Sequence, residues 1–404
     1  MLRERNFLLL WLGQLVSIFG GRFSELVIPW IILEVTSSPI KAAIVAISTH
    51  IAPLLFSLPV GVWIENRPKK KIAMSAELIR AIMMSFLVLV IYIDQFNIFV
   101  ISSILFITGI AGLFFTISVN TILPGIAGRK RLVEAHNHME AADAISTLIG
   151  PLLAGFVLTA IGAAATLGID AFSFLLSFIG IACLTIKEKV PEKNLQANKK
   201  DSWKQILYGI KLLFSTKIQQ FITLNHMVLN FSTHAISLLA IVYANQVLGL
   251  TATQTGILLS GAGAGNIVGI FLMNRVKYMY WNKLYGTILF VSGVGVILIA
   301  LSPNMWSAFA GMFLFDGALS MAFVINGAAR QTVTSDIFLA RVSSGGFLLA
   351  GIVIITANGY AGIVAELFNP VLALLVCAVI LLVNSYLSFI QKDLKKSLSS
   401  FGID

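Results

Sequence analysis

The sequence predicts an all-α membrane protein in which twelve transmembrane helices form two pseudo-symmetric six-helix bundles. Three observations predict this class. The chain of 404 residues is 58% hydrophobic and only 11% charged, whereas a soluble protein carries about 25% charged residues. Its apolar residues gather in twelve long runs, and its basic residues lie almost entirely in alternate connections between those runs. Long apolar runs indicate helices, because open sheet edges cannot lie in lipid.

Each apolar run approaches the ~20 residues that a helix needs to cross the hydrocarbon core. We place the runs at Phe7–Leu33, Ala42–Ile64, Ile72–Ile93, Phe96–Leu123, Val133–Ile161, Ala164–Ile186, Ile218–Leu248, Thr253–Met273, Leu284–Leu301, Met305–Val333, Val342–Leu367 and Val371–Ile390. The first run is too long for the apolar part of a signal peptide, so we expect no cleaved leader.

The basic residues assign a side to each connection, because cytoplasmic loops are enriched in Lys and Arg. With the N-terminus inside, every connection from an even to an odd run is basic. The outer connections hold a single basic residue, Lys41. The net charge of +10 is thereby explained without a nucleic-acid partner. We expect a multi-pass protein of a bacterial plasma membrane with both termini in the cytoplasm.

A polar stretch divides the chain into halves. It begins as a charged linker and continues at Trp203–Phe214, where apolar residues recur at helical spacing and Lys204 and Lys211 lie on the other face. That pattern is typical of a helix lying in the membrane interface. We therefore expect six-helix bundles at 1–186 and 217–391, a cytoplasmic linker at 187–216 and a cytoplasmic tail at 392–404.

A short basic hairpin, Gly61–Ile72, joins the second and third runs. Gly61 closes the second run, and we expect it to let another helix pass close. The carboxylate of Glu65 can dock on a neighbouring helix N-terminus or pair with a basic side chain. Arg67 and the lysines that follow hold the turn on the cytoplasmic side.

The hairpin resembles the loop between helices 2 and 3 of the major facilitator superfamily. That pattern is glycine, three residues, aspartate, arginine, one residue, glycine, then arginine or lysine. Here Glu65 stands for the aspartate, Asn66 for the first arginine and Pro68 for the second glycine. We expect a cytoplasmic gate made of Gly61, Glu65, Arg67 and Lys69 with Glu77 and Arg80, which share a face near the cytoplasmic end of the third run.

Further segments are similar to one branch of the superfamily, the drug exporters that include macrolide-efflux proteins and the enterobactin exporter. They are Leu10–Ser17, Ile28–Leu33, Glu77–Ala81, Gly150–Gly155, Asp170–Phe174, Arg330–Gln331 and Arg341–Val342. Two departures matter. Gly20 and Gly21, followed by Arg22, replace a glycine–aspartate pair, and Thr108 stands where the fourth helix often has an arginine linked to proton coupling. The coupling machinery of the branch is therefore not carried over intact.

Ionisable side chains inside the apolar runs are candidates for chemistry, because each costs about several kcal/mol unless it is paired or faces water. Arg22 and Glu25 lie three apart and share a face. They are either a self-neutralising structural pair or a cavity-lining pair whose carboxylate binds a proton or a cationic group. Glu140 and Asp143 repeat this spacing on the fifth run, and Asp316 is the clear intramembrane acid of the C-terminal half.

Gly150 and Pro151, with Gly155, resemble the antiporter motif of the superfamily's exporters. Proline bends a membrane helix and glycine permits close packing, so we expect a helix-bending element here. Asp170, near the outer end of the sixth run, is expected to make a structural hydrogen bond. The histidines form no metal-binding pattern and the two cysteines lie inside apolar runs, so we expect no metal site.

The resemblance and the intramembrane acids together imply a proton-coupled exporter of small amphiphilic or hydrophobic compounds, such as macrolide-like drugs or siderophores. It would be a monomeric antiporter working by alternating access among membrane lipids. It would not be an enzyme, and the proton gradient would stand in place of a cofactor. Because Leu132–Gly155 also looks similar to lysophospholipid flippases, lipid transport is the alternative. A non-transporting receptor or scaffold and a nutrient importer stay open.

Overall fold

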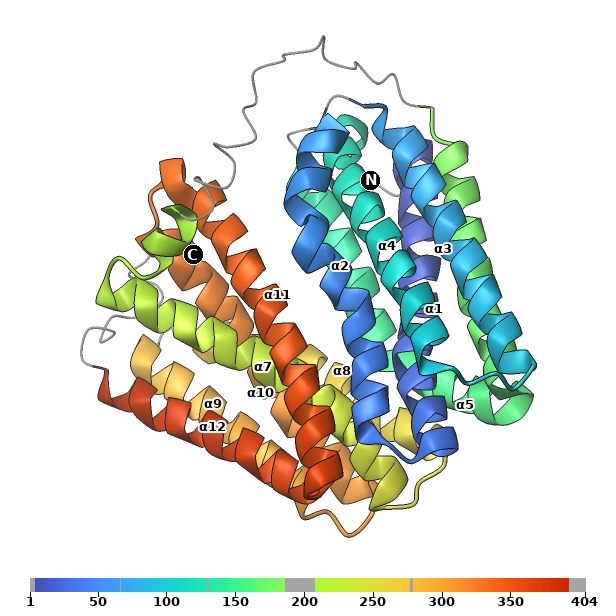
Figure 1. Ribbon diagram of the computed structural model, residues 1–404. Helices are drawn as coiled ribbons and strands as arrows, with labels where there is room; N and C mark the ends of the chain where they lie inside the picture. Colours follow the sequence, from blue (N-terminus) through green and yellow to red (C-terminus); the bar gives the residue numbers. More distant parts are fainter. Residues whose placement is uncertain (1–3, 66, 129–130, 186–207, 277–278, 392–404) are drawn as a thin grey trace. The chain divides into compact units, whose positions relative to one another are not determined.

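The computed structural model describes residues 4–65, 67–128, 131–185, 208–276 and 279–391. Within these ranges eleven helices are long and apolar enough to cross a membrane, so the all-α membrane class is confirmed there (Figure 1). They are α1 (Arg5–Thr36), α2 (Pro39–Glu65), α3 (Lys69–Tyr92), α4 (Ile98–Ala127), α5 (Leu132–Ala182), α7 (Lys217–Gln246), α8 (Ala252–Val276), α9 (Trp281–Ala300), α10 (Met305–Val333), α11 (Asp336–Leu367) and α12 (Pro370–Ile390).

The segment α5 contains two spans. Its 51 residues would reach roughly 75 Å as a straight helix, more than twice the thickness of the hydrocarbon core. At Gly162 the backbone takes φ 82° and ψ 170°, a conformation that glycine adopts almost alone. The first arm (132–161) and the second arm (163–182) therefore run in opposite directions (Figure 1). The predicted fifth and sixth runs meet at this residue, so the eleven helices contain the twelve predicted spans.

Asparagine and threonine side chains fix several helix starts. The Asn97 side chain accepts hydrogen bonds from the first turn of α4, and Asn304 does the same for α10. Asn369 caps α12, with Pro370 at the first helical position, where a missing N–H costs nothing. Thr216 caps α7. These side chains satisfy backbone donors that a helix start leaves free, which permits the short connections between spans.

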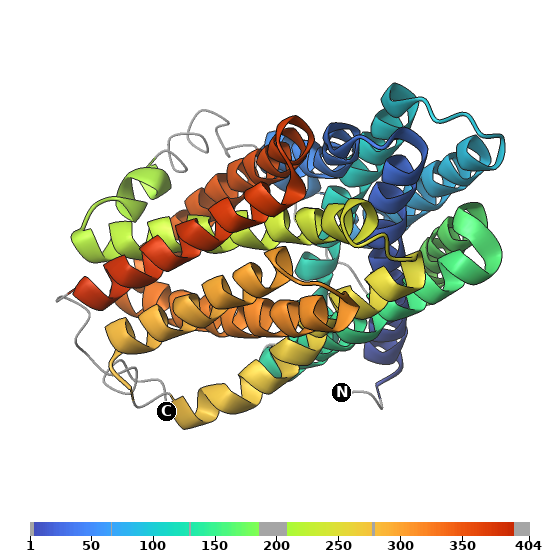
Figure 2. The same ribbon diagram turned by 90° about the horizontal axis from the view of Figure 1, so that it is seen from below.

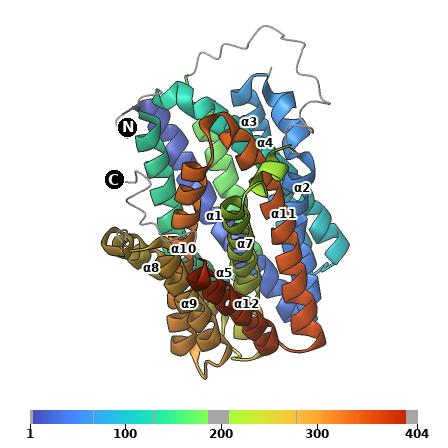
Figure 3. The same cartoon turned by 90° about the vertical axis from the view of Figure 1, so that its left-hand side faces the viewer.

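The contacts divide the chain into two compact units, residues 1–196 with 251–257 and residues 197–250 with 258–404. In the first unit α5 packs against α1 and α3, while α4 packs against α2 and α3. Figure 2 shows the green arms of α5 beside dark blue α1. In the second unit α9 packs between α10 and α12, and α7 packs against α11, as Figure 3 shows for α9 and α12. The predicted bundle boundaries stay a prediction.

Two polar segments bear on the predicted organisation. The linker up to residue 207 and the tail 392–404 lie outside the described residues. Residues 208–213 are helical, and the ring of Tyr208 lies 5.7 Å from the guanidinium carbon of Arg341 at the start of α11. This part of the predicted interfacial helix therefore packs against α11 within the second unit.

A charged cluster holds the start of α5. Arg131 hydrogen-bonds both Glu134, at 2.9 Å from its Nε, and Glu4 just before α1. The hydrogen bond to Glu134 raises the pKa of the Arg131 guanidinium.

The end of the second arm is capped by a lysine from α3. Lys70 donates to the carbonyls of Ala182 and Leu184 at 2.8 and 2.7 Å.

Candidate functional site

Arg22 joins two helices of the first unit. Its Nη1 donates to Glu25 Oε2 at 2.8 Å, and its Nη2 donates to Asp143 Oδ1 at 3.0 Å and to Thr147 Oγ1 at 2.9 Å. The pairing of Arg22 with Glu25 follows from their spacing on α1, as expected. Asp143 and Thr147 come from the first arm of α5. One guanidinium thus holds two carboxylates, and we call these four residues the Arg22 cluster.

The carboxylates of the Arg22 cluster are open to a ligand. The side chain of Arg22 is 24% exposed, whereas those of Glu25 and Asp143 are 66% and 53% exposed. Arg22 donates to one oxygen of each carboxylate, Oε2 of Glu25 and Oδ1 of Asp143. Both carboxylates therefore keep acceptor capacity for a proton or a cationic group.

The motif glycine Gly150 makes room for Arg22. A Cβ at Gly150 would lie 2.7 Å from Arg22 Cβ and 2.9 Å from Arg22 Cγ, distances that side chains cannot adopt. Gly150 of the antiporter-like motif therefore packs directly against Arg22 of the Arg22 cluster. The helix continues through Pro151, so bending there stays a prediction. The carbonyl of Gly155 accepts from Thr253 Oγ1 at 3.1 Å, a residue of the same unit.

Glu77 and Arg80 lie in the interior of the first unit. Arg80 Nη1 donates to Glu77 Oε1 at 2.9 Å, and the side chains of Arg80 and Glu77 are 18% and 0% exposed. The guanidinium carbon of Arg80 lies 3.9 Å from the ring centroid of Phe174 and 5.6 Å from that of Phe115. Both residues were expected in a gate near the helix end. Arg80 lies eleven residues into α3, roughly 16 Å along the axis.

Asp170 lies beside this pair. It is 1% exposed, and the hydroxyl of Ser24 donates a short hydrogen bond to its Oδ2. Ser173 Oγ donates to the Asp170 carbonyl at 2.7 Å and lies 3.3 Å from Oδ1. The expected structural hydrogen bond is thus present. Arg80 and Glu77 are within electrostatic reach of this carboxylate, a proximity that two separate runs of sequence do not reveal.

The remaining gate residues are Gly61, Glu65, Arg67 and Lys69. No other described side chain or helix has an atom within 4 Å of where a Cβ at Gly61 would be, so the expected close approach of another helix stays a prediction. The guanidinium carbon of Arg67 lies 3.9 Å from the ring centroid of Trp63, which is a cation–π contact. Lys69 begins α3. The side chain of Glu65 lies outside the described residues, so its docking stays a prediction.

Two further acidic candidates are Glu140 in the first unit and Asp316 in the second. Glu140 is exposed, three residues before Asp143 on the first arm of α5. Asp316 belongs to the second unit, is half-buried, and accepts a hydrogen bond from Asn266 Nδ2 at 2.9 Å. No group of three metal-ligating side chains occurs in the described ranges. The structure therefore brings together three of the five candidates, Arg22, Glu25 and Asp143.

One ionisable residue of the second unit escaped the sequence analysis as a site. Arg330 lies in the last turn of α10, and its Nε and Nη2 are buried without a hydrogen-bond partner in the described part of the chain. Its electrostatic neighbours are Tyr285 and His226, neither of which is an anion at neutral pH. A cation in the last turn of a helix normally compensates the helix dipole, so no local pattern indicates this isolation.

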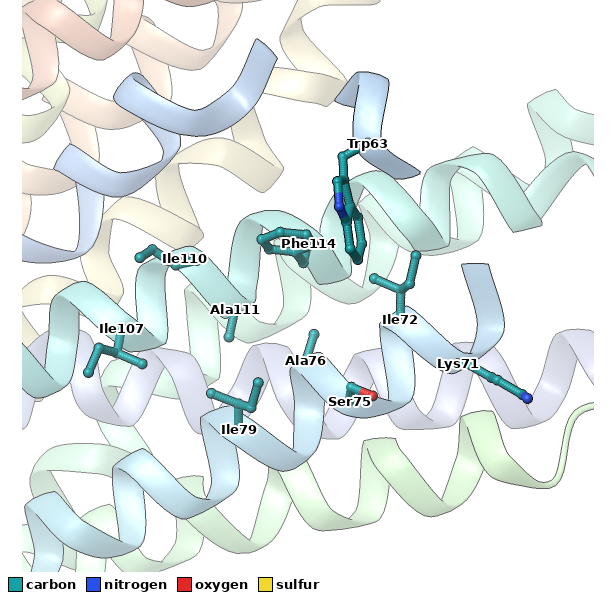
Figure 4. A pocket seen from close by; sticks show the side chains of 10 residues that line it. All are labelled: Trp63, Lys71, Ile72, Ser75, Ala76, Ile79, Ile107, Ile110, Ala111 and Phe114. Atoms are coloured by element: carbon teal, nitrogen blue, oxygen red, sulfur yellow. The ribbon is translucent and has the colours of Figure 1, made fainter. Parts of the chain in front are cut away.

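An apolar cavity of about 320 Å³ opens between α2, α3 and α4. Figure 4 shows Ile79 and Ile107 at one end, with Trp63 and Ile72 at the other. Lys71 extends away from the apolar side chains at that end (Figure 4). The cavity has the size and lining for an apolar group, and its chemistry is separate from that of the Arg22 cluster.

Characterised relatives share part of the chain. Macrolide efflux protein A of Streptococcus pyogenes is 23% identical over 181 residues, which cover 45% of this chain and 45% of that protein. Multidrug efflux pump Tap of Mycolicibacterium fortuitum is 24% identical over 188 residues, again 45% of each chain. The chain spans about half the length of the curated relatives it matches.

Solved structures share the whole fold. A bacterial homologue of the human lysosomal transporter Spinster superposes with a TM-score of 0.75 at 13% identity, covering 99% of this chain and 97% of that one. The nucleoside transporter NupG gives 0.72 at 15% identity, covering 96% and 100%. A bacterial homologue of the iron transporter ferroportin gives 0.71 at 13%, covering 100% of both. At such identities the likeness shows the fold alone.

A family match also covers nearly the full chain. The family described as "Transmembrane secretion effector" matches residues 1–399. That range includes α1 to α12 with the Arg22 cluster, so the match and the fold agree over nearly the full chain. The chain belongs to the transmembrane secretion effector family of the major facilitator superfamily, a family of membrane transporters rather than enzymes.

Proposed function

We propose that this protein is a proton-coupled exporter of small amphiphilic or hydrophobic compounds. The observation that carries the proposal is the Arg22 cluster, in which a guanidinium and two half-open carboxylates lie along membrane-spanning segments. Charged side chains inside a membrane span are costly unless they are paired or face water, and they commonly mark substrate or ion pathways. The names of the macrolide and multidrug efflux relatives support export as the direction of transport.

The chemistry follows from competition at the carboxylates. Arg22 neutralises part of the charge on Glu25 and Asp143. A proton, or a cationic or hydrogen-bonding group of the substrate, can bind these carboxylates in place of the Arg22 guanidinium. Movement of the two halves around such a site would expose it to each side of the membrane in turn. Protons entering down their gradient would then displace the substrate on the outer side, with no cofactor involved.

Efflux from bacteria that lack their own exporters tests this proposal. Cells expressing the chain are loaded with macrolides, fluorescent dyes and siderophores, and accumulation is followed with and without a protonophore. We expect lower accumulation of at least one class, restored by the protonophore. Unchanged accumulation of every compound, with the protein shown to be in the membrane, would contradict export.

Variants connect that assay to the proposed residues. Glu25→Gln and Asp143→Asn remove a proton-binding carboxylate each, so we expect both to abolish transport while expression is kept. Asp316→Asn in the second unit is expected to do the same. Glu34→Gln, an exposed glutamate on α1, is the matched control. Normal drug-dependent proton flux in the first three variants would contradict the role of these acids.

A second candidate function is a lysophospholipid flippase, and Arg330 favours it. Its Nε and Nη2 have no hydrogen-bond partner in the described part of the chain, and a guanidinium suits a phosphate group. Asp336 begins α11, and its side chain lies outside the described residues. Arg330 Nη1 lies beside Gly346, which is ten residues further along α11, about 15 Å along the helix axis from Asp336. Inward movement of a fluorescent lysolipid from the outer leaflet, lost in Arg330→Gln, would establish this function. Drug efflux unaffected by lysolipids would exclude it.

A further inference from the structure

Two carboxylates and one guanidinium lie together inside the first unit, next to the Arg22 cluster but formed by other residues. Glu77 is fully buried on α3, Asp170 is fully buried on the second arm of α5, and Arg80 is largely buried between the rings of Phe174 and Phe115. Asp170 and Phe174 are four residues apart on a helix, so they share a face. Phe174 stacks on Arg80, and the Asp170 carboxylate is within electrostatic reach of the same guanidinium.

The four carboxylate oxygens differ in their partners. Glu77 Oε1 accepts from Arg80, and Asp170 Oδ2 accepts from Ser24. Asp170 Oδ1 has the hydroxyl of Ser173 nearby. Glu77 Oε2 is buried and has no hydrogen-bond partner in the described part of the chain. A carboxylate oxygen left bare in this way carries the desolvation cost of a charge, whereas protonation leaves only an unpaired hydroxyl, whose desolvation costs less.

The charges around this cluster do not balance if both acids are ionised. The helix α3 contributes Glu77 and Arg80, and the second arm contributes Asp170 alone. The helix α4, which also packs against α3, has no ionisable residue. From α1, Glu25 reaches Asp170 electrostatically, but its charge is already paired with Arg22, so α1 supplies no further cation to this cluster. Two ionised acids with one guanidinium would leave an unpaired buried charge, which costs several kcal/mol per ion.

We propose that the buried acids Glu77 and Asp170 together hold one proton, that Glu77 Oε2 carries it, and that this is the proton exchanged during transport. With Glu77 neutral, Asp170 and Arg80 form a balanced pair. The exchange step rests on the proposed function. Ser24, the donor to Asp170, lies on α1 between Arg22 and Glu25. One short stretch of α1 therefore contacts both this buried pair and the Arg22 cluster, which would couple the proton to the substrate.

Infrared spectroscopy of the full-length protein in lipid nanodiscs tests the bound proton without any transport. A protonated carboxyl group gives a carbonyl band that a carboxylate lacks. We expect this band at pH 7 in the wild type and its loss in Glu77→Gln. Asp170→Asn should also lose it, because Glu77 can then ionise against Arg80 with no excess charge. Glu34→Gln should keep it, and so should Glu77→Asp, which shows that the fold tolerates change at this position.

Two results would overturn the bound proton. One is a wild-type spectrum that contains no carboxyl band, or none that disappears in Glu77→Gln. The other is a band that persists in Glu77→Gln and vanishes in Asp143→Asn, which would place the proton in the Arg22 cluster. Neither result depends on whether a drug is exported, so failure here is distinct from failure of the proposed function.

Proton release tests the exchange step. An exported drug from the panel is added to purified protein in weakly buffered detergent containing a pH indicator. We expect the wild type to release protons on binding, and Glu77→Gln to bind the drug while releasing none. Equal release from the wild type and Glu77→Gln would overturn the exchange role. A wild type that exports drug regardless of the proton gradient would contradict the proposed function while leaving the infrared result intact.

Discussion

Arg22 is the residue at which α1 and the first arm of α5 meet. Its guanidinium donates to acceptors on both helices at once. A lysine carries the same charge on a single ammonium group and cannot present a planar fork of donors. At the scale of one residue, the cluster therefore depends on side-chain shape as well as on charge.

Replacing Arg22 by Lys is expected to reduce transport and to lower stability by about 1 kcal/mol. A hydrogen bond to a charged group contributes roughly 1.5–3 kcal/mol, and we discount this because Glu25 and Asp143 are largely solvated. Thermal unfolding in detergent and drug accumulation in cells measure the two effects, with Glu34→Gln as the control. An Arg22→Lys protein equal to the wild type in both would show that the fork is dispensable.

At this scale the sequence predicts neighbours on one helix and misses neighbours across helices. Helical spacing predicts that Arg22 faces Glu25, and the structure shows this pair. Nothing local indicates Asp143, which is 121 residues away. The same limit separates Glu77 from Asp170, since their proximity depends on how α3 packs against α5. Pairing within a helix follows from its period, whereas pairing between helices follows from tertiary packing.

The two-armed helix α5 is the element whose geometry depends most on a single residue. Its reversal occurs at Gly162, which has φ 82°. The sequence predicts the two spans from their length and from the charges of the flanking connections. It does not predict that the turn needs only one non-helical residue, because that depends on a backbone conformation rather than on a polar loop.

Two glycines of α5 form a matched test. Neither Gly162 nor Gly168 has a described atom within 4 Å of where an added Cβ would lie, and of the two only Gly162 has positive φ. Gly162→Ala is expected to destabilise the protein by roughly 1–3 kcal/mol, because a side chain strains this conformation. Gly168→Ala should be neutral or slightly stabilising, since alanine favours a helix. Thermal unfolding in detergent measures both. Equal stability of the two variants would contradict the role of backbone conformation.

For the whole molecule, the distribution of basic residues predicts an orientation. The connections that hold Arg67 and Arg131 would face the cytoplasm together with both termini, whereas the connection between α3 and α4 would face outside. Orientation follows from charge bias across all connections at once, so no single helix contains it.

Reporter fusions check this orientation. A fluorescent protein attached after Asp404 is expected to fluoresce, because it folds in the cytoplasm. Alkaline phosphatase inserted after Gln95, between α3 and α4, is expected to be active, because it needs the oxidising outer compartment. The same phosphatase inserted after Gly128 serves as the control and should be inactive. The opposite pattern at all three positions would reverse the assignment.

The turn at Gly162 also has a consequence for how the protein enters the membrane. Residues 157–168 contain no charged side chain, so carrying this turn across the bilayer moves no charge. Each elementary charge moved against the transmembrane potential costs about 2.3 kcal/mol per 100 mV. With the predicted orientation, insertion of this hairpin would move no charge against the membrane potential, whereas the outer connection between α3 and α4 would carry the negative charge of Asp94 across.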